Sequence, residues 1–362
     1  MKNSYQPGLT IADVHSKTGG IKVYKMSSNE NPFGPSPKAV EAIAVDLKGL
    51  HFYPERHDTV VREALVSYHK RGLTVENFTT GHGAVDLIGL IEDASFDHSN
   101  SVVVCPPAFG SYVSSAAKKG AEIIECPLDP ETFQIDSGML SRAVRSNTKL
   151  VYVCNPNNPT GTCFGQQELE KILECIPSGT LLVYDAVYFQ YATEIELPDA
   201  IQCVLDKRNI VILHSFSKVF GLAGMRIGYA ISTPEIIAKI ASGKRSFHMS
   251  SSSMVAMIAA LQDQEHISIT LENNTKQRHW LQKELENLNI RVWPSQANFL
   301  LFECPGDLMA KDLVDRLLSF GVMVRAAFDL PHHVRVTVSL PEANLQFIAA
   351  MREIVDHLKM ES

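Results

Sequence analysis

The chain has 362 residues, of which 45% are hydrophobic and 20% charged, so it is long enough for about two ordinary domains with substantial apolar cores. Its formal net charge is −7, and a chain without a basic excess is poorly suited to bind nucleic acid or an anionic membrane surface. The first residues lack the apolar core of a signal peptide, and no run of about 18 apolar residues could span a bilayer. Seven cysteines without a C-x-x-C pair predict free thiols in a reducing compartment, so we expect a cytoplasmic protein.

Short apolar runs alternate along the first part of the chain with segments whose apolar residues recur every three or four positions. Such alternation is typical of a mostly parallel sheet covered by helices, so we expect a large α/β domain. The expected buried strands are 101–105, 122–126, 150–154, 181–185, 210–215 and 227–231, and the expected covering helices are 39–50, 59–70, 85–93, 166–176 and 234–245.

The pattern changes after about Met254. A long helical stretch to about Leu288 is followed by an apolar stretch, a second helical pattern, two short strand patterns and a terminal helix. This order predicts a second, smaller α+β domain, with the boundary near residue 250. The segments after the long helical stretch are 291–303, 308–320, 322–325 and 334–339.

The segment 215–226 reads Ser-Phe-Ser-Lys-Val-Phe-Gly-Leu-Ala-Gly-Met-Arg, and its lysine lies just past the end of an expected buried strand. One interpretation is that Lys218 forms a Schiff base beside an anion site, with Ser215, Ser217 and Arg226 donating to a phosphate. The alternative is an exposed loop lysine and a structural arginine. The segment alone does not decide between them.

Two further strand ends carry polar residues. The run Asn-Pro-Asn-Asn-Pro-Thr-Gly at 155–161 is either a tight turn or a set of amides at the sheet edge where α/β proteins bind ligands. Asp185 ends an apolar strand, and a buried carboxylate there needs a partner such as a protonated ring nitrogen. Pyridoxal 5'-phosphate (PLP) requires this combination: a lysine, an acid at its ring nitrogen, and donors to its phenolic oxygen and its phosphate.

Two weaker signals fit the same cofactor. The run Thr-Gly-His-Gly-Ala-Val-Asp at 80–86 precedes a helical pattern and could bind a phosphate through its backbone, but it does not match the fingerprints of NAD or ATP sites. Phe109 is either an aromatic residue that stacks on a cofactor or an ordinary core residue. Adjacent His332 and His333 would point to opposite faces of a strand, so we expect no metal site.

Taken together, these segments resemble the fold type I PLP-dependent aminotransferases of class I and II, and among them most closely the histidinol-phosphate aminotransferases. The resemblance runs from about Tyr5 to the C-terminal helix and rests on 28–37, 53–55, 155–161, 215–226 and 334–337. It implies an N-terminal arm (1–30) that joins the small domain, a large PLP-binding domain with a mostly parallel sheet (31–250), and a small C-terminal domain (251–362).

The resemblance also implies a role for each matching residue. Lys218, Asp185 and Tyr188 would be catalytic: the lysine carries the cofactor and moves a proton, and the carboxylate holds the pyridine nitrogen protonated. The other cofactor contacts would be the backbone of Gly83, Ala84 and Val85, Phe109 on the ring, Asn158 with Tyr188 at the phenolic oxygen, Ser215, Ser217 and Arg226 at the phosphate, and Tyr53 from a neighbouring subunit. Substrate contacts would be Tyr5, Asn31, Arg325 and Arg335, the last as a bidentate carboxylate clamp.

The implied activity is amino transfer between a small amino donor and a 2-oxo acid, with histidinol phosphate and 2-oxoglutarate as the leading pair, in a homodimer that completes its active sites across the interface. An aminotransferase for aromatic or other L-amino acids, and a decarboxylase of the threonine-phosphate type, are the alternatives. Two departures from the family concern the substrate side: the segment between Arg325 and Arg335 is short, and Ser250 to Ser253 stand where an asparagine is common. A ligand-sensing regulator would need room for a DNA-binding domain before Asn29, and a nicotinamide enzyme would need a G-x-G-x-x-G fingerprint.

Overall fold

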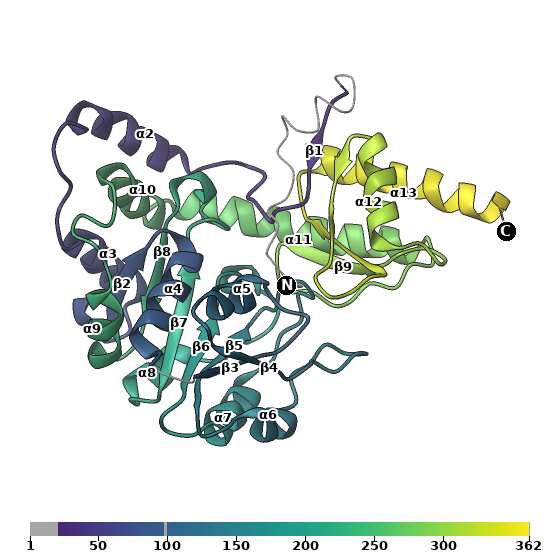
Figure 1. Ribbon diagram of the computed structural model, residues 1–362. Coiled ribbons are helices and arrows are strands. Elements are labelled where there is room, and N and C mark those ends of the chain that lie inside the picture. Colours follow the sequence, from purple (N-terminus) through teal and green to yellow (C-terminus); the bar gives the residue numbers. More distant parts are fainter. Residues whose placement is uncertain (1–20, 98–99, 362) are drawn as a thin grey trace.

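The computed structural model describes residues 21–97 and 100–361, and the centre of this part of the chain is a seven-stranded sheet (Figure 1). The strand order is β2-β8-β7-β6-β5-β3-β4. Strand β8 runs antiparallel to both of its neighbours, and the remaining pairs are parallel. The mostly parallel α/β sheet that the sequence predicts is therefore confirmed. The strands are β2 (Phe78–Gly81), β3 (Ser101–Val104), β4 (Glu122–Glu125), β5 (Thr148–Cys154), β6 (Leu181–Asp185), β7 (Ile210–Ser215) and β8 (Gly228–Ile231).

Helices cover both faces of this sheet. They are α2 (Pro37–Asp46), α3 (Thr59–His69), α4 (Gly83–Ser95), α5 (Ser111–Lys118), α6 (Ser137–Ala143), α7 (Gln166–Cys175), α8 (Ala200–Leu205), α9 (Pro234–Ser242) and α10 (Ser251–Leu261). In β6, Leu181 and Val183 belong to the apolar cluster formed with α4, α5 and α9, whereas Leu182 and Tyr184 belong to the cluster on the other face with α3, α7, α8 and α10. The strand is buried on both sides, which explains why it reads as a continuous apolar run.

A smaller body lies beside the large sheet (Figure 1). It consists of a three-stranded sheet of β11 (Arg325–Ala326), β12 (His333–Thr337) and β9 (Phe299–Glu303), packed with α11 (Gln264–Glu286), α12 (Ala310–Ser319) and α13 (Pro341–Glu361). The first described strand belongs to this body, because β1 (Tyr24–Lys25) pairs in parallel with β10 (Val322–Met323). Met26 continues this contact by donating its N–H to the carbonyl of Met323 and by packing in the small core.

Helix α11 carries side chains of both cores. The apolar side chains of α10, such as Met257, pack in the large core together with Ile267, whereas Leu281 and Leu285 pack in the small core. The continuous helical stretch that the sequence suggests is divided into α10 and α11, because Asp263 accepts a hydrogen bond from the backbone N–H of His266 and caps the second helix. Figure 1 shows α11 running from the large body to the small one.

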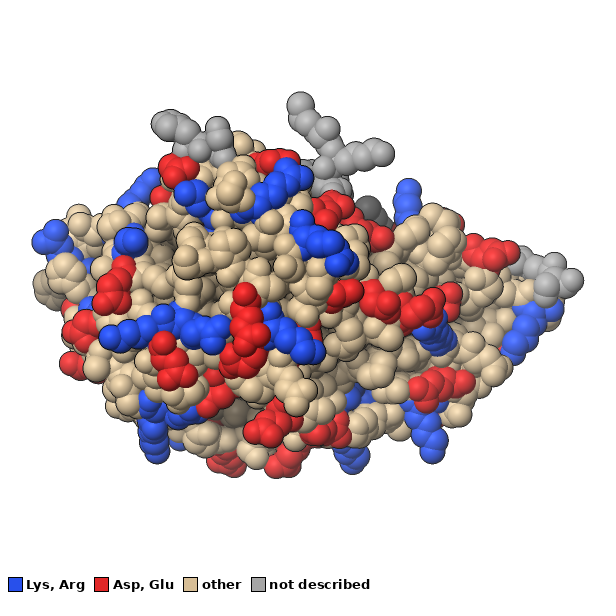
Figure 2. Space-filling view, turned by 90° about the horizontal axis from the view of Figure 1, so that it is seen from below, with Lys and Arg blue, Asp and Glu red and all other residues tan. Residues whose placement is uncertain are grey.

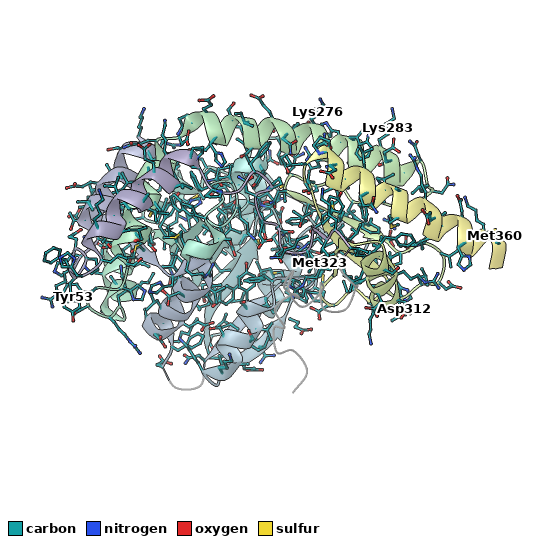
Figure 3. The ribbon with its side chains drawn as sticks, turned by 90° about the horizontal axis from the view of Figure 1, so that it is seen from above. Tyr53, Lys276, Lys283, Asp312, Met323 and Met360 are labelled. Atoms are coloured by element: carbon teal, nitrogen blue, oxygen red, sulfur yellow. The ribbon has the colours of Figure 1, made fainter. Side chains whose placement is uncertain are left out.

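The surface of the described residues carries two relevant features. Acidic and basic side chains are interspersed over the face shown in Figure 2, without a large region of one sign. Tyr53 lies at the opposite end of the molecule from Met360 of α13 (Figure 3), and its side chain is 83% exposed. Within residues 21–97 and 100–361, none of the helices combines the length and the hydrophobicity of a membrane span. The seven cysteines are free thiols, as the sequence predicts.

Candidate active site

A cavity of about 460 Å³ lies where the carboxyl ends of β5, β6 and β7 face the small body. This is the position at which open α/β sheets bind their ligands. Its wall combines loops after the large-sheet strands with β11 and β12 of the small sheet. Of the predicted site residues, the wall contains Ala84, Val85, Phe109, Asn158, Asp185, Tyr188, Ser215, Ser217, Lys218, Arg226, Arg325 and Arg335.

Lys218 projects into this cavity from the loop after β7. The loop turns tightly at Gly221, whose φ is +68° and where a Cβ would overlap the carbonyl of Gly34, so the position requires glycine. The Nζ atom of Lys218 donates to the carbonyl oxygen of Ser28 at 3.2 Å and lies 5.4 Å from the ring centre of Tyr188. Desolvation, with a smaller contribution from the charge of Arg335, lowers the pKa of Lys218 to about 7. A substantial share of this amine is therefore neutral and nucleophilic near neutral pH.

Asp185 lies at the end of β6 and is 3% exposed. Its Oδ2 accepts a hydrogen bond from the hydroxyl of Tyr112 at 2.5 Å, and its Oδ1 accepts from the backbone N–H of Val187 at 3.1 Å. Burial raises the pKa of Asp185 above its usual value, although both hydrogen bonds and the charge of Lys218 oppose that rise. A buried carboxylate with these partners is suited to hold a cationic group of a ligand.

The start of α4 and the loop after β7 form a narrow cradle at one end of the cavity. Gly83 has a φ of +78°, and a Cβ at this position would lie 2.6 Å from Nη2 of Arg226. Arg226 is held in turn by the carbonyl of Ala223, to which its Nη1 donates at 2.9 Å. A helix N-terminus, an arginine and the hydroxyls of Ser215 and Ser217 are suitable donors for a phosphate group.

The small sheet contributes a second arginine site to the cavity wall. Arg335 donates from Nη1 to Oδ1 of Asn158 and from Nη2 to the carbonyl of Ser27, both at 2.6 Å. Because Oδ1 of Asn158 is used in this way, its Nδ2 is the group that could donate to a ligand oxygen. Arg325 pairs with Arg335 across β11 and β12, and its guanidinium lies 4.9 Å from the ring centre of Phe328.

Asn31 and Tyr53 do not line this cavity, and a third predicted residue is outside the described part of the chain. The side chain of Asn31 donates to the carbonyl of Val219 at 2.8 Å and to Oγ1 of Thr270 at 3.1 Å, so it ties the N-terminal segment to the lysine loop and is not part of the cavity wall. Tyr53 stacks on Phe247 with ring centres 4.8 Å apart, away from the cavity of its own chain. Tyr5 lies outside the described residues.

Other residues that shape the site were not predicted from the sequence. Tyr112 supports Asp185, Glu30 lines the cavity, and the carbonyl of Ser28 accepts from Lys218. Tyr112 lies in the first turn of α5, three positions after Phe109, but nothing in the local sequence marks it as a partner of Asp185. Nothing local in the sequence identifies the carbonyl of Ser28, since that contact joins residues 190 positions apart.

Comparison with known proteins places this geometry in a family. The model for aminotransferase class I and II matches residues 21–351. The chain is 34% identical over 354 residues to the histidinol-phosphate aminotransferase of Moorella thermoacetica (97% of this chain, 90% of the relative) and 35% identical over 351 residues to that of Symbiobacterium thermophilum (96% and 95%). The crystal structure of histidinol-phosphate aminotransferase from Sinorhizobium meliloti in complex with pyridoxal-5'-phosphate is similar with a TM-score of 0.89 and 28% identity, covering 97% of this chain and 95% of that one.

The fold and the cavity thus define an enzyme of the fold type I class, with a lysine of lowered pKa and a buried carboxylate at the carboxyl edge of the large sheet. The chain belongs to the aminotransferase class I and II family, and the protein is a transaminase.

Proposed function

We propose that the protein transfers an amino group between histidinol phosphate and 2-oxoglutarate, with pyridoxal 5'-phosphate as its cofactor. The names of its curated relatives and the PLP complex of the Sinorhizobium meliloti structure support this proposal. The observation that carries it is the pair of arginines that lines the same cavity as Lys218, because this pair suits a substrate that has an anionic group besides its amine.

The residues of the cavity fit PLP. The cradle of Gly83 and Arg226 leaves no room for a side chain at the glycine and offers the donors that a phosphate needs. The other groups match the remaining polar atoms of the cofactor: Asp185 would face the ring nitrogen, and Asn158 with Tyr188 would face the phenolic oxygen. Phe109 lines the same cavity and would stack on the ring.

Bound PLP supplies an electron-withdrawing ring that makes the hydrogen on the substrate carbon acidic. Lys218 would accept that proton from the substrate Cα and return it to the C4' carbon of the cofactor, since a pKa of about 7 suits both steps at neutral pH. Asp185 would hold a positive charge at the ring nitrogen. Tyr188 has its hydroxyl oriented by Asn29, whose Nδ2 donates to it at 3.1 Å, so the phenolic proton is available for a ligand.

Arg325 and Arg335 would bind the anionic end of the substrate. They stand directly opposite each other in β11 and β12, so both side chains emerge on one face of the small sheet. Two like charges in this position repel each other, and an anion between them removes the repulsion. A phosphate ester carries up to about two negative charges near pH 7, and glutamate carries a second carboxylate, so both members of the proposed pair satisfy this requirement.

We also propose that two copies of the chain associate through the surface around Tyr53. The end of α2 and the stretch that links it to α3 expose four further large apolar side chains, with exposed fractions between 55% and 71%. Patches of this kind mark interaction sites, and Tyr53 could reach a neighbouring cavity because it is not engaged in its own. Light scattering should give about twice the 40.0 kDa mass of the chain, and a monomer at micromolar concentration would contradict this assembly. The four residues are Val45, Leu47, Leu50 and Phe52.

The substrate assignment is tested by half-reaction titration of the PLP-loaded protein. Histidinol phosphate, glutamate, phenylalanine and threonine phosphate are added one at a time while the absorbance of the bound cofactor is followed. We expect histidinol phosphate and glutamate to convert the cofactor to its amino form, and 2-oxoglutarate to reverse the change. Conversion by phenylalanine alone would replace the substrate, release of carbon dioxide from threonine phosphate would replace the reaction, and failure to take up PLP would contradict the cofactor.

A further inference from the structure

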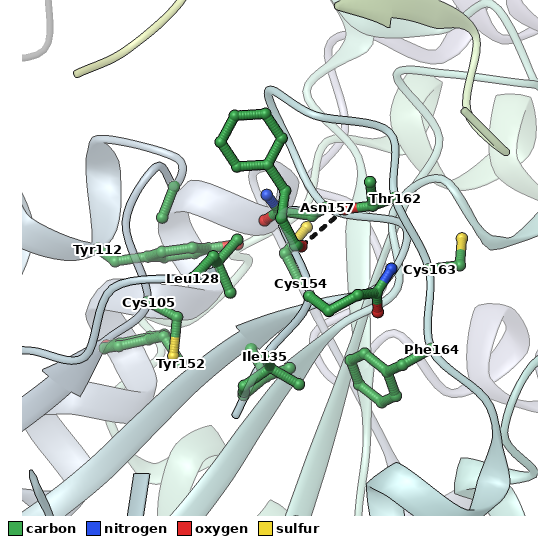
Figure 4. Close-up of a pocket in the computed structure, with 14 residues that line it drawn as sticks. Cys105, Tyr112, Leu128, Ile135, Tyr152, Cys154, Asn157, Thr162, Cys163 and Phe164 are labelled. Carbon is green, nitrogen blue, oxygen red and sulfur yellow. Dashed lines mark hydrogen bonds between the residues drawn. The ribbon is translucent and has the colours of Figure 1, made fainter. Parts of the chain in front are cut away.

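A chain of buried contacts leads from Asp185 into the large core. The hydroxyl of Tyr112 donates to Asp185 at 2.5 Å, and Tyr112 is only 1% exposed. Its ring stacks on that of Tyr152, with centres 4.7 Å apart and an angle of 10° between the planes. Figure 4 shows the two rings one above the other beside Cys154. The stack leaves the hydroxyl of Tyr112 little freedom to point anywhere but at the carboxylate.

The second tyrosine is fixed by a buried glutamate that the proposed reaction does not use. The hydroxyl of Tyr152 donates to Oε1 of Glu92 at 2.9 Å, and the hydroxyl of Ser115 donates to Oε2 at 2.5 Å. The side chain of Glu92 is fully buried, and its remaining neighbour is the ammonium of Lys119 at 3.6 Å. Glu92 lies on α4, whose N-terminus forms the phosphate cradle, and Tyr112 lies on α5. The network therefore links both ends of the proposed cofactor site.

We propose that Tyr112 is a positioning residue, whose hydroxyl fixes the Asp185 carboxylate in its plane and keeps it the weaker base in its pair with the cofactor ring nitrogen. This inference rests on the proposed function, because it assumes that Asp185 faces PLP. Tyr112 occupies one carboxylate oxygen, and the N–H of Val187 occupies the other. Both donors favour the charged carboxylate and oppose the rise in the pKa of Asp185 that burial causes.

The physical consequence concerns the proton shared between the acid and the ring. A carboxylate that already accepts a strong hydrogen bond has less affinity for a further proton, so that proton stays on the ring nitrogen. Without the hydroxyl of Tyr112, buried Asp185 would draw the proton to itself. The ring would then lose positive charge and become a poorer acceptor of electrons.

The neighbouring strand position supplies a matched control. Tyr184 immediately precedes Asp185, is 3% exposed, and also has a hydrogen-bonded hydroxyl, which accepts from Nδ2 of Asn155 at 2.9 Å. Its ring belongs to the apolar cluster on the opposite face of the sheet, whereas Tyr112 and Tyr152 belong to the cluster on the Asp185 side. Tyr184→Phe thus removes a buried hydroxyl beside the site without touching the carboxylate.

The experiment compares Tyr112→Phe with Tyr184→Phe in the PLP-loaded enzyme. For Tyr112→Phe we expect kcat to fall roughly 10- to 100-fold, with KM nearly unchanged. A loss of this size corresponds to the free energy that one hydrogen bond to a charged group contributes. We also expect the pH midpoint of the bound cofactor's absorbance change to rise. A ring with less positive charge makes the lysine nitrogen that carries the cofactor easier to protonate. Tyr184→Phe should keep the wild-type midpoint and kcat.

If Tyr112→Phe does not fold, Tyr152→Phe replaces it. That variant keeps the Tyr112 hydroxyl but loosens its ring, and it should shift the midpoint in the same direction by a smaller amount. A wild-type midpoint and kcat in Tyr112→Phe, or equal shifts in Tyr112→Phe and Tyr184→Phe, would overturn the positioning role while leaving the proposed function intact. Failure of the wild-type protein to take up PLP would instead contradict the function, and this inference with it.

Discussion

Lys218→Ala should abolish amino transfer, with a loss of turnover on the order of 10⁴-fold or more. The structure assigns two tasks to one amine: covalent attachment of the cofactor, and proton transfer at the reacting carbon. The amine is suited to both, because its Nζ lies in the cavity and its pKa is lowered to about 7. No other lysine lines the described cavity, so the lost amine has no local substitute.

The measurement is a single-turnover assay with glutamate, followed by the absorbance of the bound cofactor. The variant should still bind PLP without a covalent link, since the donors at Arg226, Ser215 and Ser217 are intact. Lys276→Ala is the control, because Lys276 is an exposed residue on α11 (Figure 3) and should behave as wild type. Full turnover in Lys218→Ala would exclude the lysine from both tasks.

The same pKa predicts how the cofactor-free protein takes up PLP. Attack requires the neutral amine, so the rate should rise about tenfold for each pH unit below 7 and level off above it. A rate that keeps rising to pH 10 would show that the pKa of Lys218 is not lowered. Stopped-flow absorbance at several pH values measures this directly.

The large body could be predicted well because its strands are buried on both faces. Strands β6 and β7 coincide with the expected ranges 181–185 and 210–215, since a fully buried strand gives an unbroken apolar run. Strand β2 was not expected, because its Phe-Thr-Thr-Gly sequence has too few apolar residues to stand out. Its place in the sheet depends on pairing with β8, some 150 residues later in the chain.

The site could be predicted where it follows strand ends. Asn158, Asp185 and Lys218 each lie at or just after the carboxyl end of a parallel strand, and parallel strands bring those ends to one edge. The pairing of Arg325 with Arg335 could not be predicted in this way. Its register depends on the loop between β11 and β12, and no sequence periodicity reveals the length and shape of that loop. Asn31 illustrates a different case: it was predicted from a motif as a substrate contact, and in the structure its side-chain amide holds the lysine loop.

Asp185→Asn should retain bound PLP but reduce turnover by on the order of 10²- to 10⁴-fold. The amide keeps the shape of the carboxylate but has no charge, so it cannot stabilise a protonated ring nitrogen, and a neutral pyridine accepts electrons poorly. The phosphate cradle and Lys218 are unaffected, which is why binding should persist. Single-turnover kinetics with glutamate measure the loss, and Asp312→Asn is the matched control, because Asp312 is an exposed residue on α12 (Figure 3).

Stability separates this chemical effect from damage to the fold. A buried charge is costly even with two hydrogen bonds, and burial already raises the pKa of Asp185. The neutral amide removes that cost, so the cofactor-free variant should unfold at the same temperature as wild type or slightly higher. A large loss of turnover with unchanged stability assigns the carboxylate to the reaction. Near-normal turnover would mean that another acid faces the ring. A marked fall in melting temperature would mean that the fold itself needs the hydrogen bonds from Tyr112 and Val187 to a charged carboxylate.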